Sequence, residues 1–386
     1  MKEIFLFLLA LVNARLARTD EVWDNLWLQK SPLPSESPAS MAYLASLQGG
    51  VVCQNQTSPA SPLVTACVEL QDAISDALGV SVPLTFTDDN LNHNVLWVRA
   101  TTANERGLRN HSSDIAEEAF RVYWGDDGGP LTLESPSGRG ALFGAFRFIS
   151  HLRRETIPVV LESDTSAAMI DPSWEGISDS PLAPLRIWQL WDNLDGTIER
   201  GYGGASLVHW EELPSVLRPR LFEFARLLAS VGINAIALSN VNSCDSDNGN
   251  ALLLSSSTLE KAGALASVFA QYGIASFLTP CFSSPMIDGV GNLSTADPLD
   301  PAVQEWWRSK VADIADTFRT HANDAASSGK DIINTFGGFL MKADSEGLPG
   351  PSTCEGKKQN SIYLLPESLF SYYFLHGHLT PTPSLI

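Results

Sequence analysis

The chain has 386 residues, of which 44% are hydrophobic and 18% are charged, so it can bury a large core and is not a disordered polymer. Its 25 Lys and Arg against 44 Asp and Glu give a net charge of -19. Nucleic acid and anionic membrane surfaces are therefore not expected as partners, because like charges repel. At about 150 residues per domain, the length predicts two or three domains.

The first residues have the pattern of a secretory signal, predicted over 1–17. Lys2 supplies a positive start, Ile4–Val12 is an unbroken apolar run, and Ala14 and Ala17 are small residues before a cleavage point. The run has nine residues, too few to span a bilayer, which needs about 20. A buried N-terminal helix is the alternative. We therefore expect a secreted, extracellular protein. Export also favours glycosylation at the three Asn-x-Ser/Thr sequons, Asn55, Asn110 and Asn292.

The five cysteines permit disulfides in an exported chain but do not form a disulfide scaffold. Cys53–Cys67 and Cys244–Cys281 are possible bridges, which would leave Cys354 unpaired. No two cysteines have the C-x-x-C spacing typical of structural zinc. We predict neither a metal site nor a cofactor.

Residues 18–180 predict an N-terminal α/β domain. A helix is expected around 70–78, short strands at 94–98 and 121–124, and an amphipathic helix over 138–152. The glycines that open this last helix have the spacing G-x-G-x-x-x-G, one residue longer than the dinucleotide-binding pattern. They predict a helix start that packs closely on its neighbours.

From residue 181 onward, strand and helix patterns alternate. Strands are predicted at 185–191, 233–240, 274–282 and 339–345. Helices are expected over 213–232, after a capping box at 257–260, and after an Asp300 cap followed by Pro301. The third helix should bury one face, formed by Val303, Trp307, Val311, Ile314 and Phe318. Buried strands that alternate with helices predict a parallel sheet, and the strand spacing suits a (β/α) barrel at least as well as an open sheet.

Polar residues follow each of these strands, at the end where barrels carry their chemistry. They are Trp191-Asp192-Asn193, Asn240-Val241-Asn242, Ser283-Ser284 and the segment 342–346. Because side chains alternate along a strand, Lys342, Asp344 and Glu346 share one face. If that face points inward, Glu346 can act as an acid or base and Lys342 can bind an anion. The alternative is a solvated edge strand.

Five segments together resemble the family 67 α-glucuronidases, and the resemblance covers about residues 20–354. They are 191–202 (WDNLDGTIERGY), 230–235, 240–242, 295–301 and 337–351. The resemblance implies an N-terminal α/β domain, a (β/α)8 barrel and a C-terminal helical domain. It also implies metal-free, inverting hydrolysis of α-1,2-linked (4-O-methyl)glucuronic acid from glucuronoxylan or aldouronic acid oligosaccharides, and a possible homodimer in the full-length family.

Carried over by position, the resemblance assigns roles to individual residues. Glu346 matches the general acid, and Lys342 matches the lysine that binds the uronate carboxylate. The segment 191–202 is expected to line the sugar site through Trp191, Asp192, Glu199 and Arg200. Glu199 and Arg200 could equally pair with each other as a structural brace.

The resemblance fails near the end of the chain. An inverting hydrolase needs a second carboxylate, but the acids after Glu346 are Glu355 and Glu367, and neither lies in a matching motif. We therefore expect 181–347 to hold strands 1–4 of the barrel, the C-terminal half to be missing, and 348–386 to be a divergent tail. The chain as written should be catalytically inactive. The alternatives are a non-catalytic carbohydrate-binding remnant and a hexosaminidase-like barrel. Hexosaminidase-like enzymes usually have an adjacent Asp-Glu pair at the end of the fourth strand, whereas here Ser345 separates Asp344 from Glu346.

Overall fold

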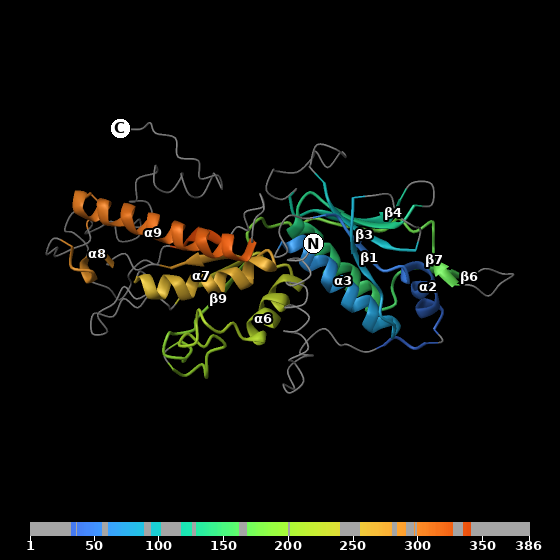
Figure 1. The fold of residues 1–386 in the computed structure, drawn as a ribbon, viewed down its shortest axis with the longest axis horizontal. Coiled ribbons are helices and arrows are strands. Elements are labelled where there is room, and N and C mark those ends of the chain that lie inside the picture. The colour runs from blue at the N-terminus through green and yellow to red at the C-terminus, as the bar shows by residue number, and fades with distance from the viewer. Residues whose placement is uncertain are drawn as a thin grey trace.

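The computed structural model describes residues 32–35, 37–55, 61–88, 94–101, 117–125, 129–161, 168–199, 201–239, 255–279, 284–290, 297, 299–326 and 335–340. Within these residues the fold is mixed α/β, with a six-stranded sheet, a four-stranded sheet and a two-stranded ribbon. Figure 1 shows the two larger sheets in different halves of the molecule. The predicted α/β class with a parallel sheet is confirmed at this level.

The six-stranded sheet has the order β2-β1-β3-β5-β4-β8. Its strands are β1 (Val51–Cys53), β2 (Leu84–Phe86), β3 (Leu96–Ala100), β4 (Phe120–Trp124), β5 (Leu131–Ser135) and β8 (Ile177–Asp179). β4 runs antiparallel to β5 and β8, and the other pairs are parallel. The ribbon is formed by β6 (Val159–Leu161) and β7 (Ala168–Ile170), beside α2 (Pro38–Leu47).

Two helices, α3 (Pro62–Leu78) and α5 (Gly138–Arg153), cover one face of this sheet. The glycine-rich start of α5 is a helix N-terminus as predicted, since the Ser137 hydroxyl accepts a hydrogen bond from the Gly140 amide at 3.1 Å. A Cβ on Gly144 would lie 2.5 Å from Leu133 Cδ1, so glycine lets the helix approach the sheet closely. The permitted Cys53–Cys67 disulfide is present and links β1 to α3. The other cysteines lie outside the described residues.

The four-stranded sheet is parallel throughout, in the order β12-β11-β10-β9. Its strands are β9 (Ile187–Leu190), β10 (Ala235–Leu238), β11 (Ala275–Leu278) and β12 (Phe336–Phe339). They alternate with α6 (Pro219–Ser230), α7 (Ser256–Gln271), the short α8 (Ser284–Ile287) and α9 (Pro301–Ala326). Sequential strands are thus neighbours in the sheet, and α7 and α9 lie side by side (Figure 1).

Three sequence predictions in this half are corrected. β12 begins at Phe336, three residues before the predicted strand at 339–345, of which 341–345 lie outside the described residues. Phe277 packs directly on Gly337, whose Cβ would come within 2.3 Å of that ring. The cap of α7 is Ser255, whose Oγ accepts from the Thr258 amide at 3.3 Å, and the predicted capping box at 257–260 lies inside the helix. α6 begins at Pro219, not at residue 213, since proline is favoured at the first helical position.

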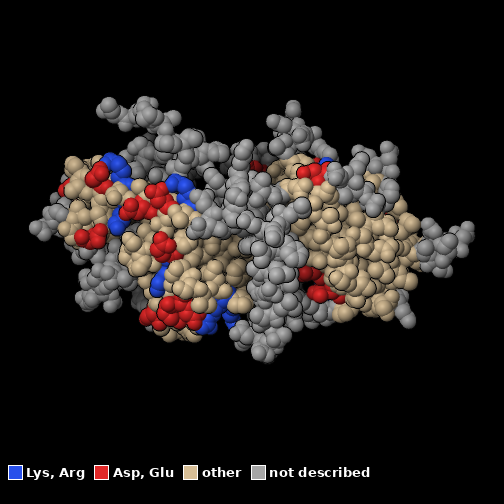
Figure 2. Space-filling view, viewed as in Figure 1, with Lys and Arg blue, Asp and Glu red and all other residues tan. Residues whose placement is uncertain are grey.

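The start of α9 is as predicted. Asp300 Oδ1 accepts a hydrogen bond from the Ala302 amide at 2.8 Å, and Pro301 is the first helical residue. The predicted inner face of this helix is buried, at Val303, Trp307, Val311, Ile314 and Phe318. The helix continues to Ala326. On its outer side, acidic and basic side chains lie next to one another (Figure 2), including the pairs Arg308–Glu305 and Arg319–Asp316.

The two faces of the four-stranded sheet differ in the size of their side chains. Ile236, Leu238 and Leu278 belong to the large core that includes the helices α6 and α7. Ala235, Ala237, Ala275 and Phe277 form a separate small cluster on the other face. Three of these four residues are alanines, and Ile187 and Leu340 pack against the cluster.

A buried polar network joins the two halves of the molecule at the amino ends of β9 and β10. Glu118, which precedes β4, accepts from Arg139 at 2.9 Å and from Asn234 at 2.9 Å through Oε1. Its Oε2 accepts from Arg186 at 2.6 Å. A second buried pair, Glu69 on α3 with Arg226 on α6 at 2.7 Å, lies in the same interface. The first sheet is therefore tied to the base of the second.

In the part of the chain that the structure describes, none of the helices combines the length and apolar character needed to cross a bilayer.

Candidate active site

The carboxyl ends of the four parallel strands lie along one edge of the sheet. The strand-to-strand register pairs Leu190 with Leu238 and Leu238 with Leu278. Backbone hydrogen bonds continue just past the strands: the Ser239 amide donates to Leu190 O at 2.9 Å, and the Leu340 amide donates to Leu278 O at 2.8 Å. The residues that follow the four strands are thus aligned, and the edge spans three strand spacings, about 14 Å.

The segment after β9 folds into a compact loop, which we call the Trp191 loop (Trp191–Glu199 and Gly201–Val208). The Asn193 amide donates to Thr197 O at 2.8 Å, and the Gly196 amide donates back to Asn193 O at 3.1 Å. Isolated bridges connect Asp192 with Ile198 and Thr197 with Ala205. The loop therefore makes most of its hydrogen bonds within itself, and it lies at the edge where the predicted sugar site belongs.

Asp192 anchors this loop from inside. The residue is only 4% exposed. Its Oδ2 accepts from Ser206 Oγ at 2.7 Å, from the Leu207 amide at 3.1 Å and from the Val208 amide at 3.4 Å. A carboxylate with three such donors orders the two ends of the loop against each other. This role was not apparent in the sequence, and the prediction that Asp192 contacts substrate stays a prediction.

Glu199 is held in an unusual backbone conformation beside exposed aromatic rings. Its φ of 56° lies in the left-handed region, which costs a residue other than glycine about 1 kcal/mol or more. The strain is held by its amide, which donates to Trp191 O at 3.0 Å, and by Asn193 Nδ2, which donates to Glu199 O at 2.6 Å. Strained residues of this kind often cluster at functional sites.

Tyr202 is the residue of the loop that the sequence analysis did not single out. Its hydroxyl donates to Glu199 Oε1 at 3.2 Å, while the residue is 76% exposed. Trp191, 37% exposed, is the second accessible aromatic ring of the loop. Tyr202 is the last residue of the family-like segment 191–202, and this position is the one sequence signal that indicates it.

The loop carries its own negative charge. Hydrogen bonds from the Thr197 hydroxyl, at 2.6 Å, and from the Thr197 amide, at 2.9 Å, lower the pKa of Asp195 below its usual range. Together with Asp192 and Glu199, this gives three acidic side chains within the loop. In the sequence, Arg200 is the basic residue between Glu199 and Gly201, so the segment has more acidic than basic side chains.

Several predicted site residues lie outside the described residues. These are the general acid Glu346, the uronate-binding Lys342, its neighbour Asp344, and Arg200 in the Trp191 loop. Asn240–Asn242 after β10 and the sequons at Asn110 and Asn292 are also outside. The structure brings Trp191, Asp192 and Glu199 together, and the assignments of the other residues remain predictions.

The third sequon residue, Asn55, is exposed at the end of β1. Its side-chain Nδ2 donates to Asp88 Oδ2 at 3.2 Å, and its backbone amide donates to Asp88 Oδ1 at 3.3 Å. Asn55 is thus on the surface but already hydrogen-bonded to Asp88. Glycosylation at Asn55 stays a prediction.

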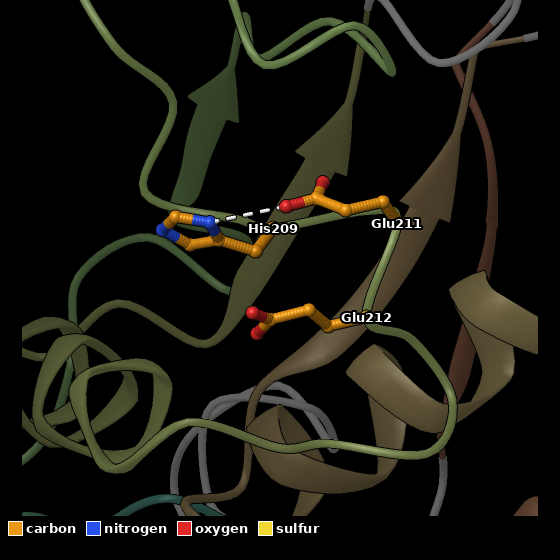
Figure 3. Close-up of side chains that lie close together, drawn as sticks. All are labelled: His209, Glu211 and Glu212. Carbon is orange, nitrogen blue, oxygen red and sulfur yellow. Dashed lines mark hydrogen bonds and ion pairs between the residues drawn. The ribbon is translucent and has the colours of Figure 1, made fainter.

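A histidine and two glutamates lie close together just after the Trp191 loop (Figure 3). His209 Nδ1 lies 3.3 Å from Glu211 Oε1. The carboxylate of Glu212 is already neutralised by Arg218, with Nε–Oε2 and Nη2–Oε1 distances of 2.6 and 2.5 Å. The hydrogen bonds from Arg218 lower the pKa of Glu212. Because the arginine competes with any cation for this carboxylate, we assign no metal to the group.

Comparison with known proteins gives the family. Residues 170–375, more than half of the chain, match the glycosyl hydrolase family 67 middle domain. The chain belongs to glycosyl hydrolase family 67. The resemblance noted from the sequence is confirmed. The matched range includes the Trp191 loop and all four strands of the parallel sheet. It continues past residue 347, where the sequence analysis begins a divergent tail.

Curated relatives carry the name α-glucuronidase A. The chain is 35% identical over 332 residues to a probable α-glucuronidase A from Aspergillus terreus, an alignment that covers 85% of this chain and 34% of the relative. It is 31% identical over 364 residues to α-glucuronidase A from Emericella nidulans, covering 90% of this chain and 37% of the relative. The chain thus spans about a third of the length of these relatives.

Among solved structures, the chain is similar to a family GH115 4-O-methyl-α-glucuronidase with specificity for decorated arabinogalactans. The TM-score is 0.47 and the identity is 15%, over 86% of this chain and 41% of that one. A likeness of this degree leaves the function open.

Proposed function

We propose that the chain recognises (4-O-methyl)glucuronic acid on xylan-derived oligosaccharides, in the manner of an α-glucuronidase, at the carboxyl edge of its parallel sheet. One observation carries the proposal: within the family 67 range, the Trp191 loop lies at this edge with exposed Trp191 and Tyr202 around a strained Glu199. Flat aromatic faces and carboxylate acceptors are suited to sugar rings and their hydroxyl groups.

Uronate binding in this proposal falls to the opposite end of the edge. The acidic Trp191 loop would repel a sugar carboxylate, whereas Lys342 follows Leu340 by two residues on the chain leaving β12. The ammonium group of Lys342 would pair with the carboxylate, and the Trp191 loop would contact the neutral part of the sugar. Hydroxyl groups and a carboxylate would thus be bound by different segments.

The proposed chemistry uses Glu346 as the acid that protonates the leaving glycosidic oxygen. Inversion requires a second carboxylate about 6.5–9.5 Å away that activates water on the other face of the ring. The 386 residues contain no carboxylate after Glu346 in a matching motif. We therefore propose that these residues bind an aldouronic acid without releasing glucuronic acid from it.

We also propose that the parallel sheet is the first half of a (β/α)8 barrel. Sequential strands are neighbours, as they are in a barrel, whereas a doubly wound sheet reverses its order at a switch point. The small face, with Ala235, Ala237 and Ala275, would be the interior.

Export remains part of the proposal. The Cys53–Cys67 disulfide is suited to an oxidising compartment, and residues 1–17 have the pattern of a signal.

Calorimetry and product analysis on the purified chain test the proposal together. Aldotriouronic acid should bind, and Trp191→Ala should weaken binding about tenfold or more, while xylotriose should bind the parent chain more weakly because it lacks the carboxylate. No free glucuronic acid should appear. A folded chain that gives no heat with aldotriouronic acid would overturn the recognition proposal, and release of glucuronic acid would overturn only the lack of turnover. The second candidate, a sugar-binding protein without uronate preference, predicts equal affinity for both saccharides.

A further inference from the structure

The six-stranded sheet carries an ordered group of charged and aromatic side chains on the face opposite α3 and α5. The register aligns Arg99 of β3 with Glu134 of β5, and Glu134 with Arg121 of β4. The next row along these strands is Trp97, Thr132 and Tyr123. We call these six residues the outer platform.

The platform faces away from the candidate active site. Alternate residues of the same strands, such as Leu96, Val98 and Leu133, belong to the core shared with α3 and α5. Those helices in turn meet the second half of the molecule, for example through Glu69 of α3 and Arg226 of α6. In Figure 1, α3 lies between β3 and α6. The outer platform is therefore separated from the Trp191 loop by a helical layer.

One carboxylate is shared by two guanidinium groups in this platform. Arg121 donates to Glu134 Oε2 through Nε at 3.1 Å and Nη2 at 2.9 Å, and the Tyr123 hydroxyl donates to the same oxygen at 2.8 Å. Arg99 Nη2 lies 3.3 Å from Glu134 Oε1. Within the six residues this leaves one positive charge in excess, in a chain whose net charge is -19.

Two hydrogen-bond donors of the platform are unsatisfied. Among the described residues, neither the buried Trp97 Nε1 nor the buried Arg99 Nε has an acceptor. Leaving a buried donor unsatisfied costs about 1–3 kcal/mol, so native proteins rarely keep such groups without a reason. The Arg99 guanidinium stacks on the Trp97 ring at 4.5 Å, which places both donors in one small region.

These features match one class of ligand. Half-buried aromatic rings suit a sugar ring, unsatisfied N–H groups suit hydroxyl oxygens, and an excess guanidinium charge suits a carboxylate. The Arg121 side chain is 37% exposed and stacks over Tyr123 at 4.2 Å, so the charge can be reached from solvent.

We propose that the outer platform is a second, non-catalytic binding site for a carboxylate-bearing saccharide. It goes beyond the proposed function and does not rest on it, because the ligand class follows from the platform's own charge and donors. Such a site would hold an acidic polysaccharide at a distance from the carboxyl edge of the parallel sheet.

Calorimetry with aldotriouronic acid on the full chain tests this site, with Trp191→Ala present throughout to weaken the candidate active site. Arg121→Gln should lower the remaining affinity about tenfold, because a charge-assisted contact is lost. Trp97→Phe, which keeps a ring but deletes the N–H, should lower it about threefold. Arg308→Gln on α9 is the matched control, since Arg308 is an exposed arginine paired with Glu305.

The outcomes separate this proposal from the previous one. Loss of affinity in Arg121→Gln and Trp97→Phe but not in Arg308→Gln supports the platform, with folding checked by circular dichroism. If Arg121→Gln does not fold, the affinity of Trp97→Phe for aldotriouronic acid, compared with that of Arg308→Gln, decides between the outcomes. Equal affinity in all three variants, equal affinity of the parent for xylotriose at this site, or complete loss of binding by Trp191→Ala alone would overturn it.

Discussion

The two ends of the parallel sheet are built from the same strands but are stabilised in opposite ways. At the amino ends, Glu118 is buried and binds groups from both halves of the molecule, with Arg139, Arg186 and Asn234 as donors. At the carboxyl ends, the Trp191 loop hydrogen-bonds mainly to itself and exposes two aromatic rings. Long-range contacts fix one end, and local contacts shape the other.

This difference indicates a division between stability and recognition. A network that spans distant segments opens only when the domains separate, so it should contribute to global unfolding. A loop with local contacts can change its residues at small cost to the fold. In parallel (β/α) folds, functional residues belong to the carboxyl end and stabilising ones to the amino end. Substitutions at the amino end should therefore mainly lower the free energy of unfolding. Substitutions at the carboxyl end should mainly lower the affinity for saccharide.

The largest loss of stability is expected from Glu118→Ala. The change leaves Arg186 and Asn234 without their shared buried acceptor and should cost about 3–5 kcal/mol in the free energy of unfolding. Urea unfolding monitored by circular dichroism measures it. Glu211→Ala, at an exposed position, is the control and should cost less than about 0.5 kcal/mol. Equal losses in the two variants would show that the amino-end network is not an anchor.

A smaller loss is expected from Asp192→Asn in the Trp191 loop. The amide keeps the shape but weakens the acceptance of hydrogen bonds from Ser206, Leu207 and Val208, which should cost about 1–2 kcal/mol. Limited proteolysis would report opening of the loop. Ser206→Ala removes one of the same donors and should have a smaller effect of the same sign. Unchanged cleavage in both would contradict the anchoring role of Asp192.

The pH dependence of stability separates buried from exposed carboxylates. Burial alone would raise the pKa of Glu134, but hydrogen bonds from Tyr123 and Arg121 and the charge of Arg99 together lower it. A group with a lowered folded pKa stabilises the fold above its unfolded value, about 4.3, and loses this contribution as the pH falls through the folded pKa.

Glu134→Gln should therefore flatten the acid side of the stability profile, measured by thermal melts between about pH 7 and pH 3. Asp195→Asn is the control. Its pKa is also lowered, by hydrogen bonds from Thr197, but the group is exposed and its contribution is screened by solvent. Identical acid profiles for the parent and Glu134→Gln would show that the ionisation of Glu134 does not contribute to stability.

The effect of Trp191→Ala on stability should stay well below that of Glu118→Ala, at about 1–2 kcal/mol, because the side chain is 37% exposed and only the buried part of its apolar surface is lost. The same variant should show the largest loss of saccharide affinity among these four. If Trp191→Ala lowered the free energy of unfolding as much as Glu118→Ala, both ends of the sheet would contribute equally to stability.

Patterns confined to one element were predicted well. The N-terminal cap and buried face of α9 and the glycine-rich start of α5 follow from local spacing and helix-end chemistry. β12 was misplaced because Phe336-Gly-Gly-Phe339 has weak strand character, and only the contact of Phe277 with Gly337 makes glycine favourable there.

Contacts between distant segments could not be predicted. Glu118 meets Arg186 and Asn234 across more than 60 positions of sequence, and no local pattern indicates this. The outer platform was missed because β5 was not predicted, and without β5 the alignment of Arg99 with Arg121 through Glu134 cannot be seen. In the Trp191 loop, the sequence indicated a polar segment but not that Asp192 turns inward.

The Cys53–Cys67 link has a practical consequence for producing this protein. Synthesis in a reducing cytoplasm would leave β1 and α3 untethered and enlarge the ensemble that must be searched during refolding. Recombinant material should therefore come from a secretory host, or else weak binding could be mistaken for a missing site.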